Sequence, residues 1–249
     1  MKSLTDARAL PVSTRDPASL ARFERALRSW HLSDGNAAAA IDEMLAHAPH
    51  FAMAHCLRAA DRLLGAEVLR QPDAAALIRP IEEGAHGANE RERRHAAAAR
   101  AGFEGNAALA LERYGDLVVD YPRDSVALQM AHAFDFRLGH REMLRDRIAG
   151  VLPHWDERMP GFAHVLGMYA FGLEETGDYE QAERIGRRSL ALEPRNAAAI
   201  HGIAHVMEMQ GRAQEGIAWL QATRPTWAAN GGFSIHNAWH LALFQIDVG

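Results

Sequence analysis

Five glycines divide most of this sequence into segments of similar length, and this regularity constrains the fold more than any other feature. Gly105, Gly139, Gly177, Gly211 and Gly249 each follow an apolar helical segment, at intervals of 34, 38, 34 and 38 residues. A period near 34 residues is that of the tetratricopeptide repeat, in which two antiparallel helices meet at a tight turn. Glycine suits such a turn because it tolerates positive φ. The sequence therefore predicts an all-α protein, a tetratricopeptide-like array of helical hairpins wound into an α-α superhelix.

Small residues and prolines recur at fixed distances from these glycines. Ala110 and Ala182 lie five residues after a turn glycine, and Pro122 and Pro194 lie seventeen residues after one. A small residue lets paired helices approach closely, and proline ends the second helix because it cannot continue the backbone ladder. A second column of alanines lies seven residues before the glycines, at Ala98, Ala170, Ala204 and Ala242. Only His132 breaks that column, so we expect it to be buried and hydrogen-bonded.

The repeat predicts where the helices lie. Gly35 and Gly65 are interpreted as more diverged turn glycines. Glycine and charge without helical periodicity predict irregular links around Gly84 to Glu90 and from Arg224 to Ser234. Strands are not expected. Helix pairs are expected at about 17–47, 51–83, 91–121, 125–152, 160–193 and 196–223, with ends uncertain by about two to four residues. We expect residues 1–249 to form one repeat domain of about six hairpins plus an unpaired last helix.

That last helix, SIHNAWHLALFQIDVG, ends at Gly249, where the first helix of another hairpin would turn. A half-hairpin leaves an apolar face uncovered, whereas repeat arrays normally close with a polar cap. Two alternatives stay open. The sequence is truncated at its C-terminus, or a second copy of the chain covers this end in a homo-oligomer.

Composition restricts the class of partner and the compartment. The net charge of -5 and the pI near 6.3 leave no basic stripe to neutralise phosphates, so neither nucleic acid nor an anionic membrane is expected as a partner. The first twenty residues lack an apolar run of signal-peptide length, and no stretch approaches the roughly 20 apolar residues of a membrane span. Cys56 is the one cysteine, which excludes an intramolecular disulfide. We therefore expect a cytoplasmic protein.

Three segments carry motifs beyond the generic repeat: HAFDFRLGHREMLRD, AIHGIAHVMEMQG and HNAWHLALF. With the intervening YAFGLEETGDYEQAE, they resemble the tetratricopeptide repeat protein 38 family, from the ARFERALRSW region to the end. Members of that family are longer and continue with further helices after the HN-x-WH segment, which favours the truncated alternative. The resemblance implies the fold and the location of a site, and it implies no particular reaction.

The histidines of two of these segments form two pairs at helical spacing. His201, His205 and Glu208 stand at i, i+4 and i+7, which places them within about 60° of one another at roughly 100° per residue. His236 and His240 form a second i, i+4 pair on the next first helix. First helices stack side by side along the concave groove that such arrays use for ligands, so both pairs are expected to face one cavity.

These five residues can hold a metal ion. Neutral imidazole and carboxylate suit borderline metals, and i, i+4 spacing lets both rings reach one ion, so Zn²⁺ or Fe²⁺ is the candidate cofactor. Asn237 and Trp239 are expected to support or wall the site. His164 and Glu174 occupy offsets that match His236 and Glu208, and they are expected to extend the polar lining. His95 matches His201 but is expected to lie too far away to share an ion.

The sequence lacks the motifs of several well-known catalytic mechanisms. HGIAH is not the HExxH of zinc proteases, because glycine replaces the carboxylate that serves as base. No G-x-S-x-G elbow, P-loop or dinucleotide fingerprint is present. Cys56 follows His55, but adjacent helical residues point about 100° apart, so a buried structural thiol is expected.

Three kinds of function therefore remain. The first is a binding module whose histidine-lined groove takes a small molecule or a short peptide, and the histidine-rich, partly apolar lining favours the small molecule. The second is an enzyme, hydrolase-like, in which the same residues hold a metal or act directly as acid and base. The third is a scaffold that contacts partners through its outer surface. The ligand-binding set common to the first two is His164, Glu174, His201, His205, Glu208, His236, Asn237 and His240.

Overall fold

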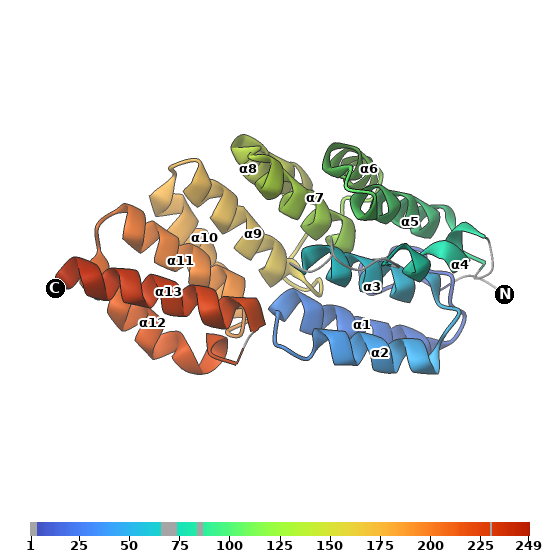
Figure 1. The fold of residues 1–249 in the computed structure, drawn as a ribbon, viewed down its shortest axis with the longest axis horizontal. Helices are drawn as coiled ribbons and strands as arrows, with labels where there is room; N and C mark the ends of the chain where they lie inside the picture. Colours follow the sequence, from blue (N-terminus) through green and yellow to red (C-terminus); the bar gives the residue numbers. More distant parts are fainter. Residues whose placement is uncertain (1–3, 66–73, 84–86, 230) are drawn as a thin grey trace. The chain divides into compact units, whose positions relative to one another are not determined.

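The computed structural model describes residues 4–65, 74–83, 87–229 and 231–249, without the side chains of residues 74, 75 and 231. Helices dominate all four ranges, and the expectation of an all-α helical-hairpin array is confirmed (Figure 1). Within these ranges the extended structure amounts to one isolated bridge, between Thr5 and Pro11. No helix in the same ranges is long and apolar enough to cross a membrane.

The described residues pack as two compact units. Unit 1 comprises residues 1–28 and 37–140, and unit 2 comprises residues 29–36 and 141–249. The helices of unit 1 are α1 (Pro17–Leu32, whose last residues belong to unit 2), α2 (Ala37–His47), α3 (Ala52–Leu64), α4 (Arg79–Glu82), α5 (Glu90–Phe103), α6 (Ala107–Asp120) and α7 (Ser125–Leu138). Those of unit 2 are α8 (Arg141–Val151), α9 (Phe162–Glu175), α10 (Tyr179–Leu192), α11 (Ala197–Met209), α12 (Ala213–Trp227) and α13 (Gly231–Val248). That residues 1–249 act as one domain stays a prediction.

The turn glycines behave as the repeat predicts. Gly105, Gly139, Gly177, Gly211 and Gly249 have φ between 67° and 90°, the left-handed region that favours glycine, and Gly35 has φ of 78°. Gly65 differs, because it ends α3 with φ of -67° in extended backbone. Its assignment as a turn glycine of the same kind was wrong.

Side-chain caps start many of these helices. Asn89, Asn106, Asp124, Asp178 and Asn196 each precede a helix and accept a hydrogen bond from a backbone N–H in its first turn. Short polar side chains at this position satisfy donors that the helix itself leaves free. Asn196 in this way fixes where α11 begins, and hence which face of α11 its histidines occupy.

Two predicted boundaries change. The irregular link expected from Arg224 to Ser234 is much shorter, because α12 continues to Trp227 and α13 begins at Gly231. The helix α12 continues past Pro225, which has no N–H and therefore leaves out one i→i−4 hydrogen bond. The second helix expected within 51–83 falls partly on residues 66–73, outside the described ranges; its described part is a 3-10 turn (Ala74–Leu77) and the single turn of α4. Gly84, the start of the other expected link, also lies outside them.

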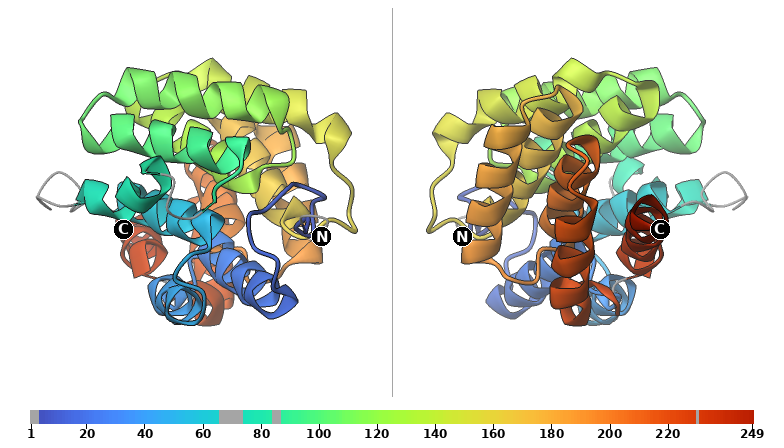
Figure 2. Two further views of the ribbon diagram at one scale, coloured as in Figure 1. Left: turned by 90° about the vertical axis from the view of Figure 1, so that its right-hand side faces the viewer. Right: turned by 90° about the vertical axis from the view of Figure 1, so that its left-hand side faces the viewer.

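Unit 2 holds the site, and small residues let its helices pack closely. The helices follow one another side by side along this unit (Figures 1 and 2). A Cβ on Gly172 would lie 2.4 Å from the carbonyl oxygen of Leu144, and a Cβ on Gly216 would lie 2.4 Å from the ring of Phe244. Glycine at these positions therefore lets α9 approach α8 and lets α13 approach α12. The core of α11, α12 and α13 is formed by Ala197, Ile200, Ile203, Ala204, Met207, Leu220, Trp227 and Phe244.

Unit 1 buries an ion network instead of a histidine group. Arg91 is 1% exposed; its Nε lies 3.1 Å from Asp124, and its Nη1 lies 3.6 Å from Asp6. His95 shares Asp124, with its Nε2 2.8 Å from the carboxylate. Cys56 is buried beside this network as expected, and burial raises the pKa of its thiol.

Candidate metal centre

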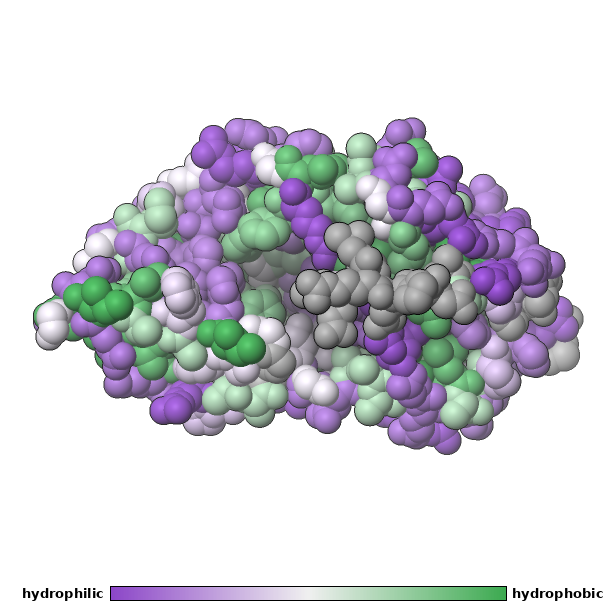
Figure 3. All heavy atoms as spheres, in the orientation of Figure 1, coloured by the Kyte–Doolittle hydropathy of each residue, from purple (hydrophilic) through white to green (hydrophobic). Residues whose placement is uncertain are grey.

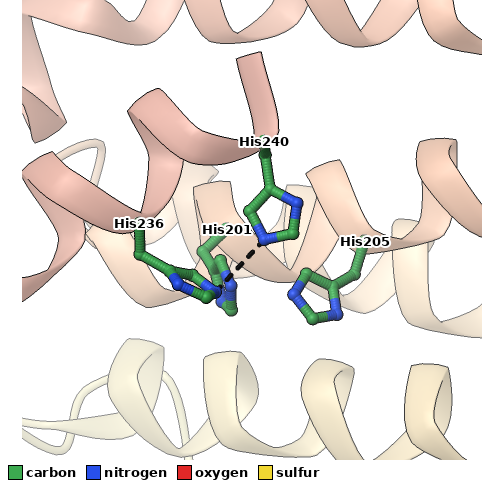
Figure 4. A group of neighbouring side chains, drawn as sticks. All are labelled: His201, His205, His236 and His240. Atoms are coloured by element: carbon green, nitrogen blue, oxygen red, sulfur yellow. Dashed lines mark hydrogen bonds between the residues drawn. The ribbon is translucent and has the colours of Figure 1, made fainter. Parts of the chain in front are cut away.

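Four histidine rings from two helices of unit 2 point into one space (Figure 4). His201 and His205 come from α11, and His236 and His240 from α13. Each pair lies one helical turn apart, and the two helices pack against each other. The structure thus brings together both predicted pairs.

The four rings are close enough for one ion. The closest ring centroids, those of His201 and His205, lie 4.3 Å apart, and the most distant, those of His205 and His236, lie 6.3 Å apart. One ligand nitrogen from each ring can be chosen so that all four lie within 4.8 Å of one another. The Nε2 atoms of His236 and His240 are 3.2 Å apart. Two nitrogens bound to one tetrahedral Zn²⁺ at about 2.0–2.1 Å would lie about 3.3 Å apart, so this group can hold a metal ion with small adjustments.

A carboxylate orients His240. Its Nδ1 lies 2.6 Å from Oε2 of Glu208, a hydrogen bond that the ring donates. With the proton on Nδ1, the lone pair is on Nε2, the nitrogen that faces His236. Carboxylates commonly fix metal-binding histidines in this way, raising their basicity and setting the tautomer. Glu208 was predicted as a ligand; the structure places its carboxylate behind the ring of His240.

Glu174 occupies a similar position behind His205. Its Oε2 lies 3.4 Å from Nδ1 of His205, although the geometry is not that of a hydrogen bond. The opposite nitrogen, Nε2 of His205, is buried and has no hydrogen-bond partner among the described residues, and the same is true of Nε2 of His201. Buried polar atoms are normally bonded, so two such nitrogens beside each other are what a ligand-binding site would leave.

Burial keeps the imidazoles in the form that binds metals. His201 is 9% exposed, and burial, together with the neighbouring histidines, holds its pKa well below the ordinary value. Burial also lowers the pKa of His236 and of His240, and His205 lowers both further, while Glu208 opposes the effect. A neutral imidazole has a free lone pair, whereas an imidazolium has none. The site is therefore ready for a cation at neutral pH.

Two aromatic rings border the group. The ring of Phe171 lies 6.1 Å from that of His201 and 5.8 Å from that of His205, and Phe233 lies 5.5 Å from His201. His236 is exposed, so the group is closed by apolar rings on one side and open to solvent at this residue. Phe233 was missed in the sequence because it lies in the stretch expected to be an irregular link.

Two predicted residues do not join the four histidines. His164 stacks on His31, with ring centroids 4.4 Å apart, instead of joining the four histidines. Trp239 is 62% exposed and therefore does not wall the site. Asn237 is fully buried, and neither its amide nitrogen nor its amide oxygen is hydrogen-bonded within the part of the chain that the structure describes. His95 is paired with Asp124 in unit 1, and the four-histidine group does not include it.

One neighbour had no signal in the sequence analysis. Carboxylate oxygens of Glu174 and Glu175 and a ring nitrogen of His205 also lie within 4.8 Å of one another. Burial and the adjacent Glu174 raise the pKa of Glu175. Glu175 was overlooked because only the offset of Glu174 matches that of Glu208.

The fold and the site together define an all-α helical-hairpin protein with a four-histidine group that can hold a metal ion. No protein-family model matches the chain.

Proposed function

We propose that this protein binds a divalent transition-metal ion through His201, His205, His236 and His240. The observation that carries the proposal is the convergence of four ligand nitrogens within 4.8 Å, from two i, i+4 pairs on adjacent helices. The orientation of His240 by Glu208 and the two unbonded buried Nε2 atoms support it. Four neutral imidazoles without an ion would leave those nitrogens buried at a cost of about 1–3 kcal/mol each.

The ligand set restricts the ion. Imidazole suits zinc, iron, copper and nickel, whereas calcium and magnesium prefer oxygen. Four histidines would complete the tetrahedral coordination of Zn²⁺. Fe²⁺ in an octahedral site would keep two positions for other ligands. Zinc and iron, the two ions predicted from the sequence, thus imply different access to the metal.

We further propose that the ligand of this site is a small molecule and not a long peptide. It would reach the ion past His236, the exposed member of the group, between the rings of Phe171 and Phe233. Two apolar rings and a few polar nitrogens are typical of small-molecule sites. The resemblance to the tetratricopeptide repeat protein 38 family remains a proposal alongside this one and adds no reaction to it.

A second candidate function is metal-free acid–base catalysis. Glu208, His240 and His236 form a chain of hydrogen bonds, 2.6 Å and 3.2 Å long, that ends at an exposed ring. A carboxylate behind an imidazole is the arrangement that makes histidine a general base. In this alternative His236 takes a proton from the substrate, and no ion is needed.

Elemental analysis of the untagged protein, purified without added metal, separates the two candidates. We expect about one zinc or iron per chain, and less than a tenth of that in a His201→Ala, His205→Ala double variant. The matched control is His154→Ala, which removes an exposed histidine of unit 2 and leaves the group intact.

Absence of metal from the wild-type protein, followed by failure of Zn²⁺ and Fe²⁺ to bind on titration, would overturn the metal proposal. The acid–base candidate would then remain. Equal metal content in the wild type and the double variant would place the ion elsewhere and would also contradict the proposal.

A further inference from the structure

A second group of possible ligands lies on the far side of His205. Glu174 and Glu175 end α9, and His205 lies on α11, which packs against it. Two carboxylate oxygens and one ring nitrogen of these residues lie within 4.8 Å of one another. Carboxylate oxygen with imidazole nitrogen is a ligand set that Zn²⁺, Fe²⁺ and Mn²⁺ accept.

Glu174 gives this group a feature that an ordinary surface cluster lacks. The residue is 5% exposed, and its Oε2 is buried without a hydrogen-bond donor among the described residues. An uncompensated carboxylate is among the most costly groups to bury. Nδ1 of His205 lies 3.4 Å from Oε2, without hydrogen-bond geometry. Two ligands of one ion at about 2.0–2.2 Å are separated by about this distance.

The two nitrogens of His205 therefore face different groups. Nδ1 lies beside Glu174, and Nε2 is the nitrogen left for the other three histidines. We propose that Glu174, Glu175 and His205 form a second divalent-cation position, so that His205 bridges two ions through its two nitrogens. The bridge rests on the proposed four-histidine site, because that site supplies the first ion.

Binding of the second ion releases a proton from His205. A neutral imidazole carries one N–H, so binding one ion through each nitrogen requires that proton to leave. It is released to water when the second ion binds, and the ring stays bound as imidazolate between two cations. No electron is transferred, and no co-reactant is needed. The second ion should therefore bind more tightly as pH rises.

Equilibrium dialysis of the metal-free full chain against Zn²⁺ tests the second position. We expect two bound ions per chain in the wild type and one in Glu175→Gln. The control Glu180→Gln changes an exposed glutamate on α10 and should keep two ions. Far-UV circular dichroism of each variant verifies that it is folded.

A His201→Ala, His236→Ala variant separates failure of this inference from failure of the proposed function. It keeps Glu174, Glu175 and His205, and we expect it to retain one weaker ion. If the wild type binds one ion that this variant loses, and Glu175→Gln binds as the wild type does, the four-histidine site stands and the second position is refuted. If the variant and the wild type bind the same number of ions, the four-histidine proposal fails instead.

Proton release provides an independent measurement. Zn²⁺ titration in weakly buffered solution should release one more proton per chain from the wild type than from Glu175→Gln. Equal release from the two proteins would overturn the bridging role of His205.

Discussion

Two histidines at the same register position, one in each unit, have opposite environments. His95 lies ten residues before Gly105 and His201 ten residues before Gly211, and both are buried. His95 is bonded to the carboxylate of Asp124, which Arg91 also approaches. His201 has three histidines around it instead. The repeat sets where a histidine lies, and its neighbours decide whether it belongs to an ion network or to a group of histidines.

The largest expected effect comes from breaking the ion network of unit 1. Asp124→Ala removes the partner of His95 and Arg91 and the N-cap of α7, leaving Arg91 buried without its closest carboxylate. We expect a loss of about 3–5 kcal/mol in the free energy of unfolding, measured with urea and far-UV circular dichroism. Metal content should not change.

Asp120→Ala is the matched control, because Asp120 makes an exposed ion pair with Arg94 in the same unit. It should cost less than about 1 kcal/mol. Similar losses in the two variants would show that the buried network contributes no more than a surface pair.

Acid should weaken unit 2 before unit 1. Burial lowers the pKa of His164 to about 4 in the folded state, whereas in the unfolded chain it would be near 6.5. The unfolded chain therefore binds more protons between these values, so stability is full above pH 6.5 and falls as pH decreases to 4. For His164 alone the loss is on the order of 3 kcal/mol, and the lowered pKa values of His201, His236 and His240 act in the same direction.

Tryptophan fluorescence can follow this loss, because all five tryptophans lie in unit 2: Trp30, Trp155, Trp219, Trp227 and Trp239. In unit 1, burial opposes the ionisation of Asp124, but His95 and Arg91 outweigh it and lower the pKa of that carboxyl. Its contribution therefore persists until pH falls below about 3.9. A urea midpoint of chelator-treated protein that is equal at pH 7 and pH 5 by fluorescence would contradict the prediction.

Metal should strengthen the same unit. An ion that binds the folded state at a free concentration of 100 times its Kd raises the free energy of unfolding by about 2.7 kcal/mol. We expect this increase with Zn²⁺ in urea unfolding followed by tryptophan fluorescence. The His201→Ala, His205→Ala variant should show no increase, and an increase in that variant would mean that Zn²⁺ stabilises the protein from another site.

The smallest effect is expected at Asn237, the buried amide beside His236. Asn237→Leu replaces two unbonded polar atoms with an apolar side chain of similar size. Removing an unsatisfied buried group should stabilise metal-free protein by about 1 kcal/mol in the same urea assay. A loss of more than about 1 kcal/mol would show that the amide makes contacts on which folding depends. Unchanged metal content would separate its role from that of the histidines.

The helices could be predicted from the sequence because a repeat encodes the same structure several times. The turn glycines, the alanines at Ala98, Ala170 and Ala204 and the helix-ending prolines all agree with the structure. The predictions for Gly65 and for the stretch from Arg224 to Ser234 were inaccurate, because no second feature of the repeat supported them. Pro225 lies inside α12 and Gly231 is the first residue of α13, so neither residue type marks a long break here.

The site was predicted in part, because register gives the face of a helix but not its neighbours. The offsets of the four histidines from the turn glycines were enough to predict that both i, i+4 pairs face one cavity. His164 has the offset of His236, yet its ring stacks on that of His31, with centroids 4.4 Å apart, whereas Glu174 of the same helix reaches His205. The position of Glu208 behind His240 depends on side-chain directions across two helices. Spacing along one helix cannot supply those directions.

The placement of two of the four histidines on α13 has a kinetic consequence for the proposed metal site. The contacts of α13 are mainly with α12 and α11, while Ile235, Trp239 and Ile246 are 78%, 62% and 74% exposed. Figure 3 shows hydrophobic surface along this helix in the orientation of Figure 1. A helix covered on one side opens more readily than one packed on both. We therefore expect a bound ion to leave when α13 opens. A change that slows amide hydrogen exchange in this helix should then slow metal release as well.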